Sequence, residues 1–292
     1  MYNLQEYVSF FQEINMHELY NMDNYFCPDR IYVINMEKDE LRMAQFCKNT
    51  ENQFFYKRIQ GVDALQEPHA TKYKNWVESI NIKDMSYEQF DWGYYLDKYP
   101  DLKEVGIEDK EQAWLHWHEY GEKELRSCNP NNNIRNMGQW GCLQSHIHVL
   151  RDAIQNDYDH IVILEDDIIL RDSWKNIMAK VGYFQKYHSL IYLGCSQHCW
   201  NNIDYENGFY YANQSMGTFA YYVKKDFFYV LLYAFEQQRK PVDQYLVSIQ
   251  QTFPEKCIVL FPNKVICDLE DSNIGEKRSN EEFYKKFKWI DN

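Results

Sequence analysis

The chain has 292 residues, with 31 Lys and Arg against 44 Asp and Glu, which gives a formal net charge of −13 at pH 7. This length suits one enlarged α/β domain with an insertion, or about two average domains, and it can bury a substantial core. The negative charge argues against a nucleic-acid backbone or an anionic membrane surface as a partner, and an enzyme of this charge that handles anionic substrates would need a local cation.

No targeting or membrane-spanning segment is expected. Apolar runs such as 161–164 and 168–170 are short, and no run approaches the length of a membrane span. The first 20 residues also lack the basic and apolar regions of a secretory signal. A cytoplasmic protein with free thiols is therefore predicted from its eight scattered cysteines. Cys195, His198 and Cys199 are close enough to suggest zinc, but no second ligand pair has matching spacing, so ordinary thiols are favoured.

Helical and strand patterns alternate along most of the chain. Residues 1–26 are predicted to form an amphipathic helical extension, because their apolar residues recur at helical spacing. Strands are expected at about 31–35, 53–59, 160–164, 190–194, 208–213, 218–223 and 257–261. Helices are expected at about 37–48, 138–155, 173–186, 225–238 and 241–251. The alternation predicts an α/β fold with a mostly parallel sheet and helices on both faces.

The alternation is interrupted at about 66–136, where a small helical hairpin is expected. Its first helix must end before Pro100, and its second helix is expected to stop at Gly121. The aromatic residues at helical spacing in this segment are Trp92, Tyr95, Tyr99, Trp117 and Tyr120. A packing decoration is the favoured interpretation, and a module that shapes an acceptor groove is the alternative.

The sharpest chemical feature is the acidic run Glu165-Asp166-Asp167, which directly follows the apolar strand expected at 160–164. Ligands of parallel α/β sheets bind outside the carboxyl ends of the strands. On an extended backbone Glu165 and Asp167 share one face, and two converging carboxylates repel each other unless a cation lies between them. Mg²⁺ or Mn²⁺ would suit such oxygen ligands, so a metal site is favoured over a solvated acidic turn.

Several short blocks resemble glycosyltransferase family 25, the group of lipopolysaccharide galactosyltransferases and procollagen galactosyltransferases. In chain order they are 31–35 with Arg42, Arg58 with 61–64, 141–146, 163–167, 217–221 and 241–243. A final Ser-Asp-Ile block is matched at 272–274, where Asn273 replaces the aspartate and weakens the case for a metal carboxylate there. The order and spacing of the blocks make the resemblance specific, and the blocks are spread over most of the range 30–275.

The resemblance implies a GT-A-like (Rossmann-like) domain over 27–292, interrupted by 66–136. It also implies a UDP-sugar donor, Mn²⁺ or Mg²⁺ bridging the diphosphate, and inversion at the anomeric carbon. The expected reaction transfers galactose or glucose to a hydroxyl of a glycan or protein acceptor, in glycan biosynthesis. The metal ligands would be Asp167 and Glu165, and the catalytic base would be Asp243. The residues expected to bind the nucleotide sugar are Asn35, Arg42, Arg58, Asp63, Ser145, Glu165 and Asp166. Glu165 would thus have both roles.

Each of these assignments has an ordinary alternative. An Asp in the first turn of a helix, as expected for Asp243 after Pro241, also complements the helix dipole. Asp63 suits a turn, the arginines suit the surface, and His146 beside Ser145 suits a core and receives no proton role.

Two other functions remain open. The first is a carbohydrate- or protein-binding module that keeps the fold without turnover, and the second is a nucleotidyltransferase, which ranks lower because no glycine-rich phosphate loop is present. A homo-oligomer is compatible with the sequence, since a dimer face built by the N-terminal helix would look the same as a packed extension. The inserted hairpin resembles an aromatic repeat, with Tyr99-Pro100-Asp101-Leu102 at its centre, that is associated with large DNA viruses. Such a source would place the protein in the host cytoplasm or the virion.

Overall fold

The computed structural model describes residues 26–81, 85–121, 123–200, 203–268, 280–287 and 289. The predicted N-terminal extension, apart from its last residue, and the 272–274 block with Asn273 therefore lie outside the described residues. In the part of the chain that is described, no helix is both long and apolar enough to span a bilayer.

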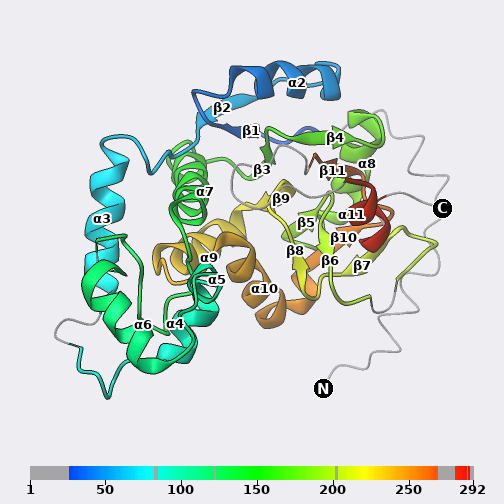
Figure 1. Ribbon diagram of the computed structural model, residues 1–292. Helices are drawn as coiled ribbons and strands as arrows, with labels where there is room; N and C mark the ends of the chain where they lie inside the picture. The colour runs from blue at the N-terminus through cyan, green and yellow to red at the C-terminus, as the bar shows by residue number, and fades with distance from the viewer. Residues whose placement is uncertain are drawn as a thin grey trace.

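A seven-stranded sheet in the order β2-β1-β3-β9-β5-β10-β7 forms the centre of the molecule (Figure 1). Its strands are β1 (Arg30–Asn35), β2 (Lys57–Gln60), β3 (His160–Glu165), β5 (Leu190–Tyr192), β7 (Phe209–Tyr211), β9 (Ala220–Lys224) and β10 (Cys257–Leu260). The strands β2, β1, β3, β5 and β10 run in one direction, whereas β9 and β7 run antiparallel to their neighbours. The predicted α/β class with a mostly parallel sheet is confirmed.

Helices cover both faces of this sheet, because its strands are apolar on both sides. One face packs against α3 (His69–Ile80), α7 (Met137–Gln155), α9 (Lys225–Glu236) and α10 (Val242–Thr252). The other face packs against α2 (Glu40–Thr50), α8 (Trp174–Phe184) and α11 (Asn280–Lys286). Successive residues of β1 show the division, since Tyr32 is buried in the first core and Val33 in the second.

Side-chain caps define where two of these helices begin. Asn136 accepts a hydrogen bond from the Gln139 amide at the start of α7, and Ser173 does the same for the Asn176 amide at the start of α8. The Asn136 cap sets the end of α7 that faces the carboxyl ends of β1 and β3.

Two short two-stranded sheets, which the sequence patterns did not predict, surround the carboxyl edge. β4 (Ile168–Leu170) pairs antiparallel with β11 (Val265–Cys267), and β6 (Ser196–Gln197) pairs antiparallel with β8 (Ser215–Met216). Because β4 begins directly after the acidic run, Asp166 and Asp167 form the turn between β3 and β4. The amide of Asp268, just after β11, donates to the carbonyl oxygen of Asp167 at 2.9 Å and fixes that turn.

The strand β9 is held in register by hydrogen bonds on both faces. Tyr221 lies opposite Ile163 of β3, and its hydroxyl is 2.7 Å from His146 Nδ1 on the α7 side. The next residue, Tyr222, points to the other face, where its hydroxyl is 2.7 Å from His160 Nδ1.

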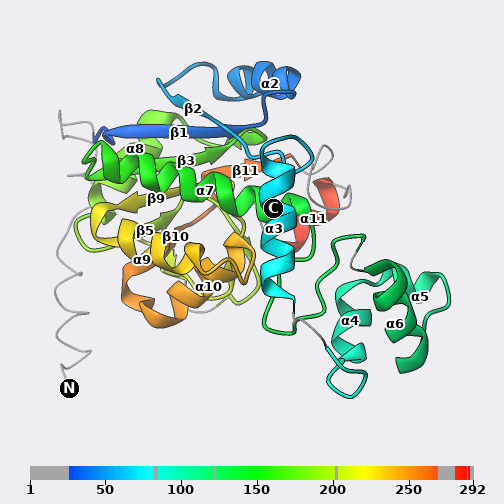
Figure 2. The same cartoon turned by 90° about the vertical axis from the view of Figure 1, so that its left-hand side faces the viewer.

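The segment expected as one insertion consists of two parts. The helix α3 belongs to the main body, because Tyr73 and Val77 pack with Trp140 of α7. The second part contains α4 (Trp92–Lys98), α5 (Asp101–Glu104), α6 (Lys110–His116) and one π-helical turn (Trp117–Gly121), and we call 85–128 the hairpin lobe. Figure 2 shows it projecting from the side of the body where β1 and β3 end.

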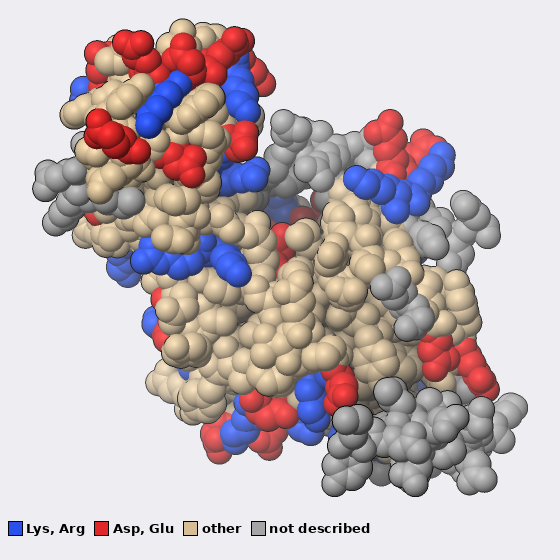
Figure 3. All heavy atoms as spheres, turned by 90° about the horizontal axis from the view of Figure 1, so that it is seen from below, with Lys and Arg blue, Asp and Glu red and all other residues tan. Residues whose placement is uncertain are grey.

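The hairpin lobe has a core of its own, which is built largely of aromatic rings. Its buried members are Phe90, Tyr95, Leu96, Tyr99, Leu102, Ala113, Trp117 and Cys128. Trp92 and Tyr120, which were expected in the aromatic seam, are 38% and 54% exposed. Seen from below (Figure 3), the lobe carries acidic and basic side chains together, whereas the adjoining surface of the body is mostly uncharged.

The two ends of the lobe meet at one place on the body. Asn129 Nδ2 donates to the Ile80 carbonyl oxygen at 2.6 Å, and the Cys128 amide donates to Asn81 Oδ1 at 3.4 Å. Further along, Lys98 Nζ donates to the Asn132 carbonyl oxygen at 2.8 Å. The chain thus enters and leaves the lobe at neighbouring points.

Candidate active site

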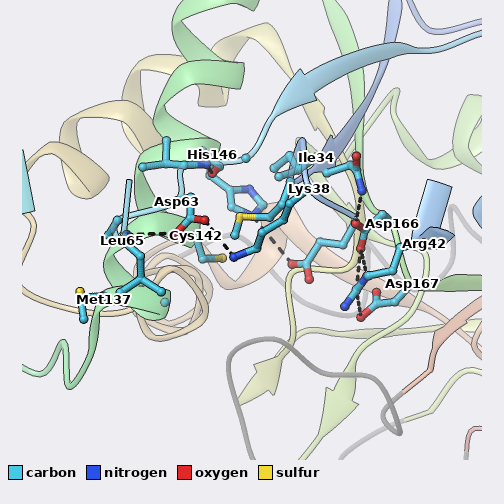
Figure 4. Close-up of a pocket in the computed structure, with 18 of the residues that line it drawn as sticks. Ile34, Lys38, Arg42, Asp63, Leu65, Met137, Cys142, His146, Asp166 and Asp167 are labelled. Carbon is cyan, nitrogen blue, oxygen red and sulfur yellow. Dashed lines mark hydrogen bonds and ion pairs between the residues drawn. The ribbon is translucent and has the colours of Figure 1, made fainter. Parts of the chain in front are cut away.

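A cavity of about 440 Å³ opens at the carboxyl ends of β1 and β3 (Figure 4). Its wall is formed by residues 34–36, 61–65, 136–138 and 165–167, together with Lys38, Arg42, Cys142, Ser145 and His146. This is the edge at which open α/β sheets bind their ligands. Most of the residues predicted to bind the nucleotide sugar or a metal meet here.

Arg42 of α2 holds the acidic turn through two carboxylates. Its Nε and Nη2 donate to Asp166 Oδ1 at 2.9 and 2.5 Å, and Nη2 lies 3.1 Å from Asp167 Oδ2. The second oxygen of Asp166 accepts a hydrogen bond of 2.6 Å from Asn35 Nδ2. Burial raises the pKa of Asp166 above its ordinary value despite these partners. Asn35, Arg42 and Asp166 therefore bind one another at the cavity wall.

Asp167 has one oxygen that these contacts leave unsatisfied. Its Oδ1 is buried and finds no hydrogen-bond partner in the described part of the chain. Burial, together with the nearby charges of Glu165 and Asp166, raises the pKa of Asp167 to about 8, although Arg42 opposes the shift. A cation that reached the free oxygen would stabilise the charged form of this carboxyl group, which burial disfavours.

Glu165 ends β3 and turns toward a different set of neighbours. Its Oε1 accepts a short hydrogen bond from the Thr218 hydroxyl and lies 3.9 Å from His146 Nε2. Burial opposes its ionisation, but His146, Thr218 and Arg42 outweigh burial and lower the pKa of Glu165. Glu165 and Asp167 both line the cavity, but the expected alternation of an extended strand does not apply, because Asp167 already lies in a turn.

Cys142 and His146 lie four residues apart on α7 and line the cavity side by side (Figure 4), and Glu165 lines the same cavity. The potential ligand atoms of these three residues all lie within 4.8 Å of one another. Burial, with the charges of Glu165 and Asp243, raises the pKa of the Cys142 thiol well above its usual range. Sequence reasoning missed Cys142, although the spacing of Cys142 and His146 on one helix face was a readable signal.

Ser145 connects two parts of the cavity wall, α7 and the loop 61–65. Its hydroxyl donates to the Gly141 carbonyl oxygen at 2.8 Å and accepts from the Val62 amide at 2.9 Å. Gly141 lets α7 approach this loop closely, since a Cβ atom there would lie 2.3 Å from the Val62 carbonyl oxygen. Both polar functions of the Ser145 hydroxyl are used in joining 61–65 to α7.

Asp63 and Arg58, the other predicted nucleotide-binding residues, differ in position. Asp63 lines the cavity, where it accepts Lys38 Nζ at 2.8 Å and the Leu65 amide at 3.0 Å. Arg58 is exposed on the edge strand β2 and donates to the Met36 carbonyl oxygen at 3.3 Å. It is not among the described residues that form the cavity wall.

Asp243 lies in the first turn of α10, as expected, although the helix begins at Val242 and Pro241 is its N-cap. Burial and the charge of Glu165 raise the pKa of Asp243. The hydrogen bond from the Gln244 amide and the charge of His198 act in the opposite direction, but they do not outweigh burial. Asp243 thus responds to the charge of the acidic site, but the described residues that bound the cavity do not include it.

A cavity at the carboxyl ends of parallel strands is where nucleotide-binding α/β enzymes hold their ligands. The family model described as glycosyltransferase family 25, an LPS biosynthesis protein family, matches residues 29–246. This span covers three quarters of the chain and every predicted site residue, and the chain therefore belongs to glycosyltransferase family 25.

The other comparisons add little. No curated protein sequence matches the chain. Among solved structures, the crystal structure of A197 from STIV is similar, with a TM-score of 0.31 and 9% sequence identity, over 86% of this chain and 97% of that chain. So distant a likeness has no bearing on the function.

Proposed function

We propose that the protein is a metal-dependent, inverting hexosyltransferase that moves galactose or glucose from a UDP-sugar to a hydroxyl of a glycan or protein acceptor. Glycosyltransferase activity in general follows from the family. The observation that carries the finer proposal is the buried, unpartnered Oδ1 of Asp167 in a cavity at the carboxyl ends of β1 and β3. A carboxylate oxygen so placed suits a metal-bound diphosphate.

The residues present fit a hard divalent cation. Glu165 and Asp167 offer carboxylate oxygens to the same cavity, and Asn35 Oδ1 is a second buried oxygen for which the described residues supply no hydrogen-bond donor. Mn²⁺ and Mg²⁺ prefer such oxygen ligands. When bound, the metal would neutralise the diphosphate as it leaves.

The remaining wall residues would orient the donor. Arg42 keeps the acidic turn in one conformation through its contacts with Asp166 and Asp167. Lys38 is 47% exposed at the cavity mouth, where its ammonium group is paired with Asp63 and lies within reach of an entering phosphate. We assign these two cations to the negative charge of the donor.

We assign the role of base to Asp243. Inversion requires a carboxylate that takes the proton of the acceptor hydroxyl on the side opposite the leaving group. Its raised pKa, caused first by burial, suits proton uptake nearer neutrality than an ordinary Asp. Its position outside the cavity wall is the observation that favours the alternative, a binding module without turnover.

The direct test is donor binding with and without Mn²⁺. Calorimetry with UDP-galactose and UDP-glucose should show binding that Mn²⁺ strengthens in the wild-type chain. Asp167→Asn keeps the shape of the side chain and should remove the Mn²⁺-dependent part. Asp97→Asn changes an acid that is 78% exposed on the hairpin lobe, and it serves as the matched control. Unchanged affinity and unchanged metal response in Asp167→Asn would contradict the proposal.

A further inference from the structure

A second set of potential metal ligands lies on the α7 side of the cavity. Cys142 and His146 sit one turn apart on that helix and face Glu165, so that one sulfur, one nitrogen and one oxygen lie within 4.8 Å of one another. These atoms come from two rigid elements, α7 and the end of β3. The mixture of donors differs from the all-oxygen set around Asp167.

The imidazole of His146 is oriented as a ligand would be. The side chain is fully buried, and its Nδ1 is 2.7 Å from the Tyr221 hydroxyl, which fixes the ring plane. Its Nε2 points toward Glu165 at 3.9 Å and makes no hydrogen bond with any residue that the structure describes. A buried ring nitrogen that makes no hydrogen bond is costly, and a metal-binding histidine commonly has its other nitrogen held by a hydrogen bond, as Nδ1 is here.

We propose that Cys142 Sγ, His146 Nε2 and a carboxylate oxygen of Glu165 form a zinc site with its fourth position open to the cavity. Three protein ligands drawn from sulfur, nitrogen and oxygen, with one open position, suit tetrahedral Zn²⁺. Thiolate and imidazole disfavour Mg²⁺ and Mn²⁺, which select oxygen ligands. The Cys142 thiol gives up its proton to solvent when zinc binds.

Because Glu165 would serve both the zinc site and the metal of the donor, zinc should inhibit sugar transfer. This consequence rests on the proposed function, whereas zinc binding itself does not. If Glu165 also serves the metal of the donor, zinc at the Cys142–His146 side withdraws that carboxylate and places a second positive charge beside it. Zinc and the donor metal would therefore exclude each other.

The test begins with the metal-free chain of 292 residues. Zn²⁺ titrated in competition with a chromophoric chelator should bind at one ion per chain. Cys142→Ser should weaken zinc binding more than the roughly 10–100-fold that loss of an outer-shell partner costs, because it removes a direct ligand. Cys47→Ser is the matched control, since Cys47 is also partly buried but lies against Tyr56, with Sγ 3.5 Å from its hydroxyl.

A spectroscopic measurement on the wild-type chain decides the ligand set even where a variant fails to fold. Co²⁺ in place of zinc should give a sulfur-to-cobalt charge-transfer band in the near ultraviolet, and Cys142→Ser should remove it. His146→Gln should weaken zinc binding in the same manner. Failure to bind one zinc, zinc affinity unchanged in Cys142→Ser, or a cobalt spectrum without the sulfur band would each overturn the site.

Asp167→Asn separates this site from the proposed function. The variant should keep its zinc affinity while losing Mn²⁺-dependent donor binding. Loss of donor binding with zinc affinity retained would support both the proposed function and the zinc site. If the wild-type chain binds zinc but no UDP-sugar, the zinc site is supported and the proposed function is contradicted. Zinc lost together with Mn²⁺ in this variant would contradict the separate site.

Discussion

Arg42 is the residue on which the acidic turn depends most directly. Its side chain is 13% exposed, and its guanidinium group contacts the carboxylates of Asp166 and Asp167, whose side chains are 8% and 16% exposed. The sequence identified Arg42, Asn35 and Asp166 as residues that would contact the donor. Their hydrogen bonds to one another show a second task, because they hold the turn that carries Asp167.

Arg42→Met should destabilise the fold by about 3 kcal/mol or more, because it leaves buried carboxylates without their cation. Urea denaturation followed by circular dichroism measures the change. Arg151→Met removes an arginine that is 57% exposed and paired with Glu236 on the surface, and it should cost less than about 1 kcal/mol. Equal effects of the two substitutions would show that the turn does not need Arg42.

Asp243→Asn should lower the transfer rate by roughly 10²–10⁴-fold, the usual contribution of a general base, and leave donor affinity nearly unchanged. Initial rates at saturating UDP-sugar and calorimetry of donor binding separate the two quantities. Should donor affinity fall while transfer stays normal, Asp243 belongs to the nucleotide site instead.

At the scale of elements, the hairpin lobe is the least predictable part. Helical spacing indicated its helices, and Tyr95, Tyr99 and Trp117 are indeed buried in its core. The sequence patterns place residues 69–80 in the insertion and predict no helix there, whereas the structure forms α3 over this range and packs it on α7. None of the described residues from 86 to 126 lines the cavity, yet the lobe projects from the side where β1 and β3 end (Figure 2).

We predict that the lobe contributes to acceptor choice and not to donor chemistry. Replacing 82–127 by a short Gly/Ser linker tests this, because Asn81 and Cys128 already lie together and α3 stays in place. Hydrolysis of the donor should survive the deletion, while transfer to the native acceptor should drop. A soluble deletion variant that transfers sugar normally would make the lobe a packing decoration.

Within the lobe, Lys98 makes stability depend on pH. It is 5% exposed between the rings of Tyr94 and Tyr99, and burial lowers its pKa to about 7. In the unfolded chain a lysine titrates near pH 10.4, so between about pH 7 and 10.4 the unfolded state binds more protons. The stability of the lobe should therefore rise with pH across this window.

Lys98→Met should be more stable than the wild type by about 1–3 kcal/mol at pH 6 to 7, and the difference should shrink toward pH 9.5. The Asn132 carbonyl oxygen keeps the Tyr94 hydroxyl as a donor in this variant. Denaturation curves across this pH range give the measurement, with Lys103→Met, at a half-exposed lysine, as control. A constant difference across the range would show that Lys98 stays charged when folded.

At the scale of the whole molecule, the sequence predicted the α/β class and the carboxyl-edge location of the acidic run. Both follow from local patterns, namely strand-helix alternation and carboxylates directly after an apolar strand. It did not predict that β9 runs antiparallel between β3 and β5, because an apolar run carries no direction. It did not single out Cys142. It assigned Arg58 to nucleotide binding, whereas Arg58 is exposed on an edge strand and is not among the described residues of the cavity wall, and such exposure cannot be read from a residue type.

The reversed direction of β9 determines which residue contacts Glu165 at the cavity. Because β9 starts where β3 ends, Thr218 just before it reaches Glu165 at the end of β3. The adjacent Tyr221 and Tyr222 bind His146 and His160 on opposite faces, so a one-residue slip would strand both hydroxyls at once. By fixing the register of β9 against β3, the two tyrosines also fix where Thr218 lies relative to Glu165. Substitutions of these tyrosines would therefore change the shape of the cavity although neither tyrosine lines it.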